Sequence, residues 1–144
     1  MKNVLVMLAA TLMLLFGISC GDGGGSAEGP SVANAGQQEP IFRSIPPKEA
    51  KALMESRKDL LLIDVRGPEE MREGYIAGSR LIPIAELARG RMSLPAGNPL
   101  LLICAVGGRS YAVGQYFSRK GYPEIYNLQG GISAWKEAGL PLKH

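Results

Sequence analysis

The sequence predicts a single α/β domain with a small, mostly parallel β-sheet flanked by helices. Two continuous apolar runs, at residues 60–63 and 100–103, have the length expected of strands that are covered on both faces. Segments with helical spacing separate such runs, and strands that alternate with helices favour a parallel sheet. The chain has 144 residues, which suits one folded domain preceded by a leader and a linker.

The first half of the domain shows this alternation. Pro47 suits the first turn of a helix, because its fixed φ angle matches that position. The apolar run at 60–63 predicts a strand that ends at Asp64. A short helix is then expected to begin in residues 67–70, and a short strand is expected at residues 81–82.

The second half places a cysteine at the end of a buried strand. Cys104 follows the apolar run at 100–103, and residues 113–117 predict a helix that stops near Gly121. The remaining elements are a strand, a glycine turn and a short helix: residues 125–128, Gly130 with Gly131, and the segment carrying Trp135. Chemistry in parallel sheets gathers at the carboxyl ends of the strands, which is where Cys104 is expected to lie.

The N-terminal segment has the pattern of a signal peptide followed by a lipid-attachment cysteine. A basic start and an apolar run at residues 4–16 end in small residues just before Cys20. This pattern resembles a bacterial lipoprotein signal, so we expect residues 1–19 to be removed and Cys20 to be lipidated. An ordinary cleaved signal is the alternative. Residues 20–40 predict a flexible linker to a domain at 41–144, held in the periplasm or cell envelope by a membrane anchor.

The composition excludes several classes of function. The formal net charge is +3, from 16 basic and 13 acidic residues spread along the chain, which argues against nucleic-acid binding. Cys20 and Cys104 lie in such different contexts that a disulfide is not expected, and with one histidine they make no metal site. That histidine, His144, ends the chain at what should be its loosest point. A Cys–His catalytic pair is therefore not expected.

The segment of residues 104–110, here named the Cys104 loop, carries the candidate chemistry. A glycine-containing loop before a helix lets backbone N–H groups turn inward and bind an anion, helped by the positive end of the helix. Such donors lower the pKa of a thiol and would also stabilise a persulfide. Cys104 is the candidate catalytic residue. The candidate substrate-binding residues are the rest of the loop: Ala105, Val106, Gly107, Gly108, Arg109 and Ser110.

Four motifs in order resemble the rhodanese family. The Cys104 loop matches Cys-x-x-Gly-x-Arg-Ser, and residues 128–135 match Leu-x-Gly-Gly-x-x-x-Trp. Upstream, residues 64–66 match the Asp-Val-Arg motif, and residues 74–78 match the Gly-x-Ile-x-Gly turn. The resemblance covers roughly residues 41–142, which is the whole expected domain.

The resemblance implies a sulfurtransferase that moves sulfane sulfur through a cysteine persulfide, without a metal or an organic cofactor. It implies Cys104 as nucleophile and sulfur carrier, and Arg109 as the cation for an anionic donor such as thiosulfate. The expected partners are a small-molecule sulfur donor and an acceptor, which is cyanide, a small thiol or a thiol-bearing protein. We expect the protein to act as a monomer.

The upstream motifs are interpreted as structural. Asp64 is expected to accept hydrogen bonds from backbone N–H groups of the next loop, and Arg66 is expected to pair with Glu69 or Glu70. Tyr75 stands where the family commonly has histidine, and we assign it a structural role.

Three alternatives remain open. A cysteine-dependent phosphatase or arsenate reductase also places a thiolate before an arginine, but its loop resembles Cys-x5-Arg, one residue longer than the segment from Cys104 to Arg109. A non-catalytic rhodanese-like docking module would not need Cys104. A persulfide relay between proteins would keep the same chemistry and change only the partner.

Overall fold

A five-stranded sheet forms the centre of the domain in the computed structural model, which describes residues 39–144. All its strands run parallel, in the order β1-β5-β4-β2-β3. The strands are β1 (Ile41–Ile45), β2 (Leu61–Asp64), β3 (Arg80–Leu81), β4 (Leu100–Ile103) and β5 (Glu124–Leu128). The single α/β domain with a parallel sheet, expected from the sequence, is confirmed.

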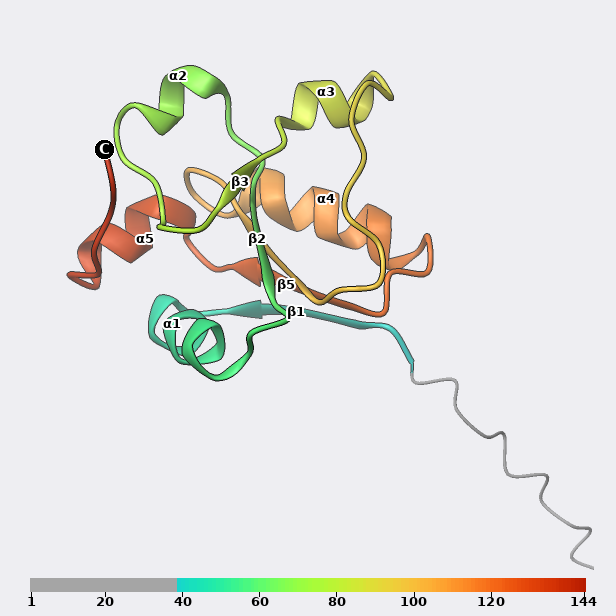
Figure 1. Cartoon of the computed structure of the whole chain (residues 1–144), viewed down its shortest axis with the longest axis horizontal. Coiled ribbons are helices and arrows are strands. Elements are labelled where there is room, and N and C mark those ends of the chain that lie inside the picture. Colours follow the sequence, from blue (N-terminus) through green and yellow to red (C-terminus); the bar gives the residue numbers. More distant parts are fainter. Residues whose placement is uncertain (1–38) are drawn as a thin grey trace, which may run out of the picture. The chain divides into compact units, whose positions relative to one another are not determined.

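Helices cover both faces of this sheet, with α1 and α4 on opposite sides of the strands (Figure 1). The helices are α1 (Pro47–Ser56), α2 (Pro68–Met71), α3 (Ile84–Ala88), α4 (Gly108–Ser118) and α5 (Gly131–Glu137). One core cluster joins the sheet to α1 and α5 through Ala50, Ile132 and Trp135. A second cluster includes Val113 of α4 and packs against Ile84 of α3.

The central strand β4 determines which way Cys104 faces. Successive strand residues point to opposite faces. Leu101 and Ile103 therefore join the cluster under α1 and α5, whereas Leu100, Leu102 and Cys104 join the cluster under α4. All four residues of β4 are buried, and the strand places the cysteine beside α4.

Two elements were not expected from the sequence. Strand β1 is mostly exposed, with Arg43 and Ser44 between apolar residues, and it becomes a strand by pairing with β5 along its whole length. Helix α3 follows Pro83 and occupies only five residues, too few for a recognisable helical period. Strand β3 also begins at Arg80, one residue before its predicted start.

The C-terminal segment is tied to the domain, so the expectation of a loose end is wrong. The backbone N–H of Tyr75 donates to the Lys143 carbonyl and the Lys143 N–H donates back, both at 2.8 Å. The Trp135 indole N–H donates to the Pro141 carbonyl at 3.0 Å. Tyr75 thus serves the fold through its backbone.

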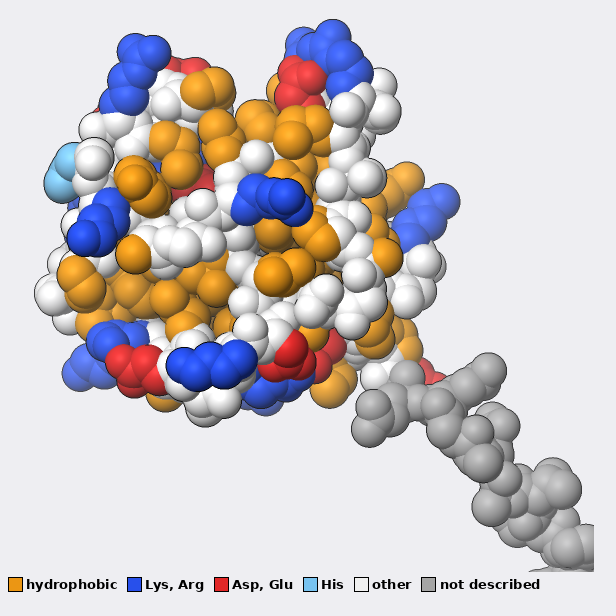
Figure 2. Space-filling view, viewed as in Figure 1, with side chains coloured by type: hydrophobic (Ala, Val, Ile, Leu, Met, Phe, Trp, Pro, Cys, Tyr) orange, Lys and Arg blue, Asp and Glu red, His pale blue; other side chains and the backbone are white. Residues whose placement is uncertain are grey.

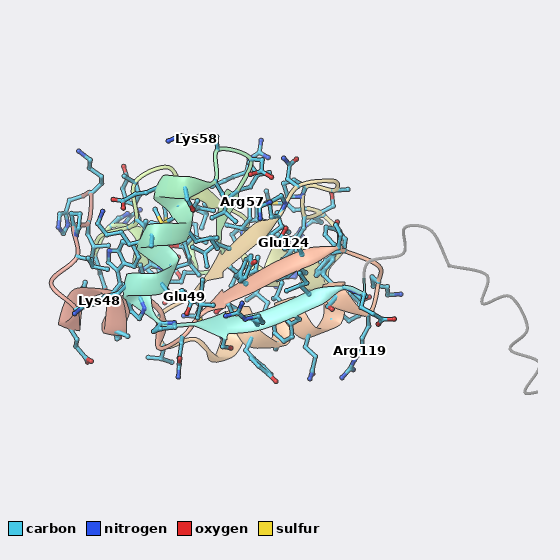
Figure 3. All side chains as sticks on the ribbon, turned by 90° about the horizontal axis from the view of Figure 1, so that it is seen from below. Lys48, Glu49, Arg57, Lys58, Arg119 and Glu124 are labelled. Atoms are coloured by element: carbon cyan, nitrogen blue, oxygen red, sulfur yellow. The ribbon has the colours of Figure 1, made fainter. Side chains whose placement is uncertain are left out.

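A surface ion pair joins the end of α1 to the beginning of β5. Arg57 donates to Glu124 at 2.9 Å and to Asp59 at 2.8 Å. Arg57 and Glu124 are labelled in Figure 3. Because these groups are partly exposed, water competes for each of them and the pair adds little stability.

The predicted signal peptide, Cys20 and most of the linker lie outside the described residues. Of the linker, only Glu39 and Pro40 are described, and both are exposed. Within residues 39–144, no helix has both the length and the apolar character needed to cross a membrane.

Candidate functional site

The sulfur of Cys104 lies inside a group of hydrogen-bond donors. The residue is fully buried, with 0% of its surface exposed. The Gly107 N–H donates to Sγ at 3.1 Å, and the Ser110 hydroxyl lies 3.3 Å from the same sulfur. A cysteine that served only to fill the core would not need these contacts.

These donors determine the protonation of the thiol. Burial raises the pKa of Cys104, and hydrogen bonds to the sulfur act against it and prevail, so the pKa lies below its ordinary value. The donors are the Ser110 hydroxyl and the backbone N–H groups of Ser110, Val106 and Gly107. More of the thiol is therefore thiolate at neutral pH than in a free cysteine.

A left-handed glycine gives the loop its turn. Gly107 has φ = 89° and precedes the first residue of α4, Gly108. A Cβ atom at Gly107 would lie 2.9 Å from the backbone nitrogen of Gly130, so the position has room only for glycine. Gly108 has open space around it and begins the helix, and the backbone N–H of Ser110 in its first turn is directed at the sulfur.

The first residues of α5 donate hydrogen bonds to backbone carbonyls of the Cys104 loop. The Ile132 N–H donates to the Cys104 carbonyl at 2.9 Å, and the Ser133 N–H donates to the Ala105 carbonyl at 3.0 Å. A Cβ atom on Gly131 would lie 2.2 Å from the Cys104 carbonyl oxygen. Because α5 engages these carbonyls, the loop presents N–H groups rather than C=O groups to the sulfur. The glycine turn, expected only as a turn, thus shapes the site.

Ser110 connects the sulfur to a buried residue that sequence analysis missed. Its hydroxyl lies 2.6 Å from Oδ1 of Asn127, whose side chain donates to Ser44 at 2.9 Å. A hydroxyl has one proton. Three acceptors lie within its reach: Oδ1 of Asn127 at 2.6 Å, and the Gly107 carbonyl and the sulfur at 3.3 Å each. Of these, a thiolate sulfur would be the charged acceptor. Asn127 sits in an apolar strand, and only its burial marks it as unusual.

We expect Ser110→Ala to raise the pKa of Cys104, because the thiolate loses a hydrogen bond. A hydrogen bond to a charged group contributes about 1.5–3 kcal/mol, so thiol reactivity on the acid side should fall by about tenfold or more. The pH dependence of the alkylation rate with iodoacetamide measures this shift. Ser118→Ala, at the far end of the same helix, is the matched control, and an unchanged pH profile for Ser110→Ala would contradict the account.

Arg109 does not point freely into solvent but pairs with a carboxylate. Its guanidinium donates to the two oxygens of Glu70 at 2.8 and 2.6 Å. The hydrogen bonds to Glu70 raise the pKa of Arg109, and the negative charge of Cys104 adds a smaller effect in the same direction. Sequence analysis missed Glu70 as part of the site.

The expected pairing of Arg66 with Glu69 or Glu70 is wrong. Its guanidinium pairs instead with Asp64 at 2.8 Å, and both side chains are almost wholly buried, at 3% and 0% exposed. Asp64 ends β2 inside the domain, and a buried carboxylate requires a nearby cation. The same carboxylate accepts the Arg66 backbone N–H at 3.0 Å, which confirms the expected capping of the next loop.

Four residues of the loop thus have distinct surroundings. The Gly107 backbone N–H and the Ser110 hydroxyl contact the sulfur, Arg109 pairs with Glu70, and the Val106 side chain projects into solvent with 69% exposure. Within residues 39–144, no group of three or more histidine, cysteine, aspartate or glutamate side chains is placed to hold a metal ion.

An apolar groove lies apart from these residues, between α3 and α4. Its volume is about 380 Å³, and hydrophobic side chains beside α3 are visible in Figure 2. It is lined by Ile84, Leu87, Ala88, Ala112, Val113, Tyr116 and Phe117. None of these belongs to the Cys104 loop.

The fold and the site together define a class of protein: a parallel α/β domain that presents a buried thiol to the N–H groups of a helix start. The sequence model of the family described as "Rhodanese-like domain" matches residues 46–138. The chain therefore belongs to the rhodanese-like domain family.

Relatives and solved structures agree with this assignment. The chain is 34% identical over 85 residues to a protein named "Sulfurtransferase" from Allochromatium vinosum, covering 59% of this chain and 79% of the relative. It is 30% identical over 95 residues to "Thiosulfate sulfurtransferase GlpE" of Pseudomonas aeruginosa, covering 66% and 84%. The crystal structure of a rhodanese-related protein from Thermoplasma volcanium superimposes with a TM-score of 0.60 at 37% identity, covering 70% and 97%.

Proposed function

We propose that this protein is a sulfurtransferase that carries sulfane sulfur as a persulfide on Cys104. The observation that supports this most strongly is the environment of Sγ, where the Gly107 N–H and the Ser110 hydroxyl approach a buried sulfur. Donors placed in this way stabilise a thiolate and also the anionic outer sulfur of a persulfide. The names of the relatives point to the same chemistry.

The reaction has two transfers. The Cys104 thiolate attacks the sulfane sulfur of the donor, a new S–S bond forms, and the donor's own bond to that sulfur breaks. With thiosulfate the leaving group is sulfite, and with a thiol persulfide it is a thiolate. An acceptor such as cyanide or a thiol then attacks the outer sulfur and regenerates the Cys104 thiolate.

The pairing of Arg109 also favours sulfur transfer over phosphate chemistry. A phosphatase needs its loop arginine to bind the phosphate oxygens, whereas both oxygens of Glu70 already occupy the guanidinium of Arg109. The loop segment between Cys104 and Arg109 is also one residue shorter than the phosphatase pattern.

The site would work outside the cytoplasm. The leader pattern supports export, with cleavage before Cys20 and a lipid anchor on that residue at a membrane of the cell envelope. The acceptor there would be a small thiol or a thiol-bearing protein. We propose that the protein acts as a monomer on its membrane tether.

The proposal is tested by incubating the purified protein with a sulfur donor and cyanide and measuring thiocyanate. Thiosulfate and the persulfide of 2-mercaptoethanol serve as two separate donors. We expect thiocyanate to form faster than in the protein-free mixture with at least one donor. No acceleration with either donor would rule out the enzyme and support a docking module that keeps the fold without the chemistry.

A further inference from the structure

The one cation of the Cys104 loop is already neutralised in the structure. Arg109 and Glu70 form two parallel hydrogen bonds, at 2.8 and 2.6 Å, which is the strongest geometry for this kind of pair. The two side chains are 39% and 27% exposed, so water reaches the pair only in part. An anion that needed Arg109 would have to displace Glu70 first.

Glu70 is held in this position by its surroundings. Its Oε2 accepts the Gly67 N–H at 3.0 Å, and its backbone carbonyl accepts a hydrogen bond from Arg66 at 3.1 Å. The hydrogen bonds from Arg109 lower the pKa of Glu70 to about 2, so the carboxylate stays charged throughout the physiological range. The pair is therefore a fixed part of the site.

The cationic side chains of the site are both paired with carboxylates, which disfavours the binding of a dianion. Arg66 is neutralised by Asp64, and Arg109 is neutralised by Glu70. Among these side chains, the Cys104 thiolate is then left as the one charge without a partner of opposite sign, and the backbone N–H groups of the loop are already directed at it. Thiosulfate carries two negative charges and would approach this site against repulsion. A thiol persulfide carries at most one negative charge on its sulfur atoms, and none in its protonated form R–S–SH, so it meets less repulsion than thiosulfate.

We propose that Glu70 is a specificity-determining residue that withholds Arg109 from anionic donors, so that Cys104 takes sulfur from a thiol persulfide in preference to thiosulfate. This inference rests on the proposed sulfur transfer. In the preferred step, the Cys104 thiolate attacks the outer sulfur of R–S–SH. The S–S bond of the donor breaks and the outer sulfur becomes the outer sulfur of a Cys104 persulfide. The proton of that sulfur passes to the departing thiolate R–S⁻, which leaves as the thiol R–SH.

The test compares the loading of Cys104 in Glu70→Gln with loading in the natural protein. Thiosulfate or the persulfide of 2-mercaptoethanol is added in excess, and the Cys104 persulfide is followed by mass spectrometry after rapid alkylation. Gln keeps the shape of Glu70 and removes its charge. We expect loading from thiosulfate to accelerate by about tenfold or more, and loading from the persulfide to change by less than about threefold.

Glu69→Gln is the matched control, because Glu69 lies next to Glu70 on α2 and is exposed. It should leave both loading rates unchanged within about twofold, since screened surface charges act weakly. If Glu70→Gln leaves the ratio of the thiosulfate loading rate to the persulfide loading rate unchanged, whether or not both rates fall, the inference is overturned. Glu70 would then only support the structure of the loop. Loading of the natural protein from neither donor would overturn the proposed function itself.

A measurement on the natural protein gives an answer even if Glu70→Gln does not fold. The rate of Cys104 loading from thiosulfate is measured at increasing potassium chloride concentration. A net negative site repels the dianion, and salt screens that repulsion, so the rate should rise with salt. A rate that falls with salt would mean that the site attracts the dianion through an available Arg109, which would overturn the inference.

Discussion

The substitution Cys104→Ser is expected to abolish sulfur transfer while leaving the domain folded. A serine hydroxyl cannot form a persulfide, so the covalent path is lost and the rate should fall by more than about 10³-fold. The Ser side chain is close in size to Cys, and it can accept the Gly107 N–H that now reaches the sulfur at 3.1 Å. Thiocyanate formation from the better of the two donors measures the loss.

The folded state of this variant is checked by urea denaturation. The free energy of unfolding should change by less than about 1 kcal/mol, because the hydrogen bonds of the buried group are kept. A folded Cys104→Ser protein that retained appreciable turnover would show that the sulfur is carried elsewhere, and the assignment of Cys104 would be wrong.

The substitution Asp64→Ala is expected to cause the largest loss of stability. It would leave the Arg66 guanidinium, which is 3% exposed, buried without its counter-charge. Removing one member of a buried ion pair costs about 3–5 kcal/mol. Arg66 also donates to the backbone carbonyls of Glu70 and Gly74, at 3.1 and 2.9 Å, so the segment that carries Glu70 should loosen as well. Urea denaturation measures the change.

Asp59→Ala provides the matched control for this prediction. Asp59 pairs with Arg57 across the same spacing of two residues, but its side chain is 52% exposed. Because exposed pairs contribute about 0–1 kcal/mol, this variant should unfold close to the natural protein. Equal effects of the two substitutions would show that the burial of the Asp64–Arg66 pair does not govern its contribution.

The parts of the fold that could be predicted are those with a strong local pattern. The run at Leu100–Ile103 is apolar throughout and becomes the central strand, and the glycines after Cys104 mark the turn into α4. Strand β1 has no such pattern. It lies at the edge of the sheet with β5 as its one neighbour, and pairing with β5 stabilises it more than the burial of its own side chains does. Its existence depends on residues more than eighty positions away.

The contacts within the Cys104 loop could be predicted from the sequence, but the partners of the loop residues could not. Cys104, Gly107 and Ser110 are close in sequence, and their contact follows from the start of a helix. Glu70 is 39 residues from Arg109, and Asn127 is 17 residues from Ser110. A glutamate on a short surface helix and an asparagine within a strand give no local sign of either contact.

The pairing of Arg66 shows why local reasoning can also mislead. Glu69 and Glu70 are near in sequence and seemed natural partners for it. The carboxylate of Asp64 decides otherwise, because it accepts hydrogen bonds from both the backbone N–H and the guanidinium of Arg66, two residues beyond the end of β2. The carboxylate of Glu70 is then left for Arg109, which is the contact on which the proposed donor preference rests.

The central claim, that Cys104 carries sulfur, is tested most directly by the mass of the protein after exposure to a donor. The protein is treated with the persulfide of 2-mercaptoethanol and separately with thiosulfate, alkylated, digested and mapped by mass spectrometry. We predict that the peptide containing Cys104 gains the mass of one sulfur atom, and that cyanide or a reducing thiol removes it. A Cys104 peptide that gains no sulfur from either donor would contradict the account.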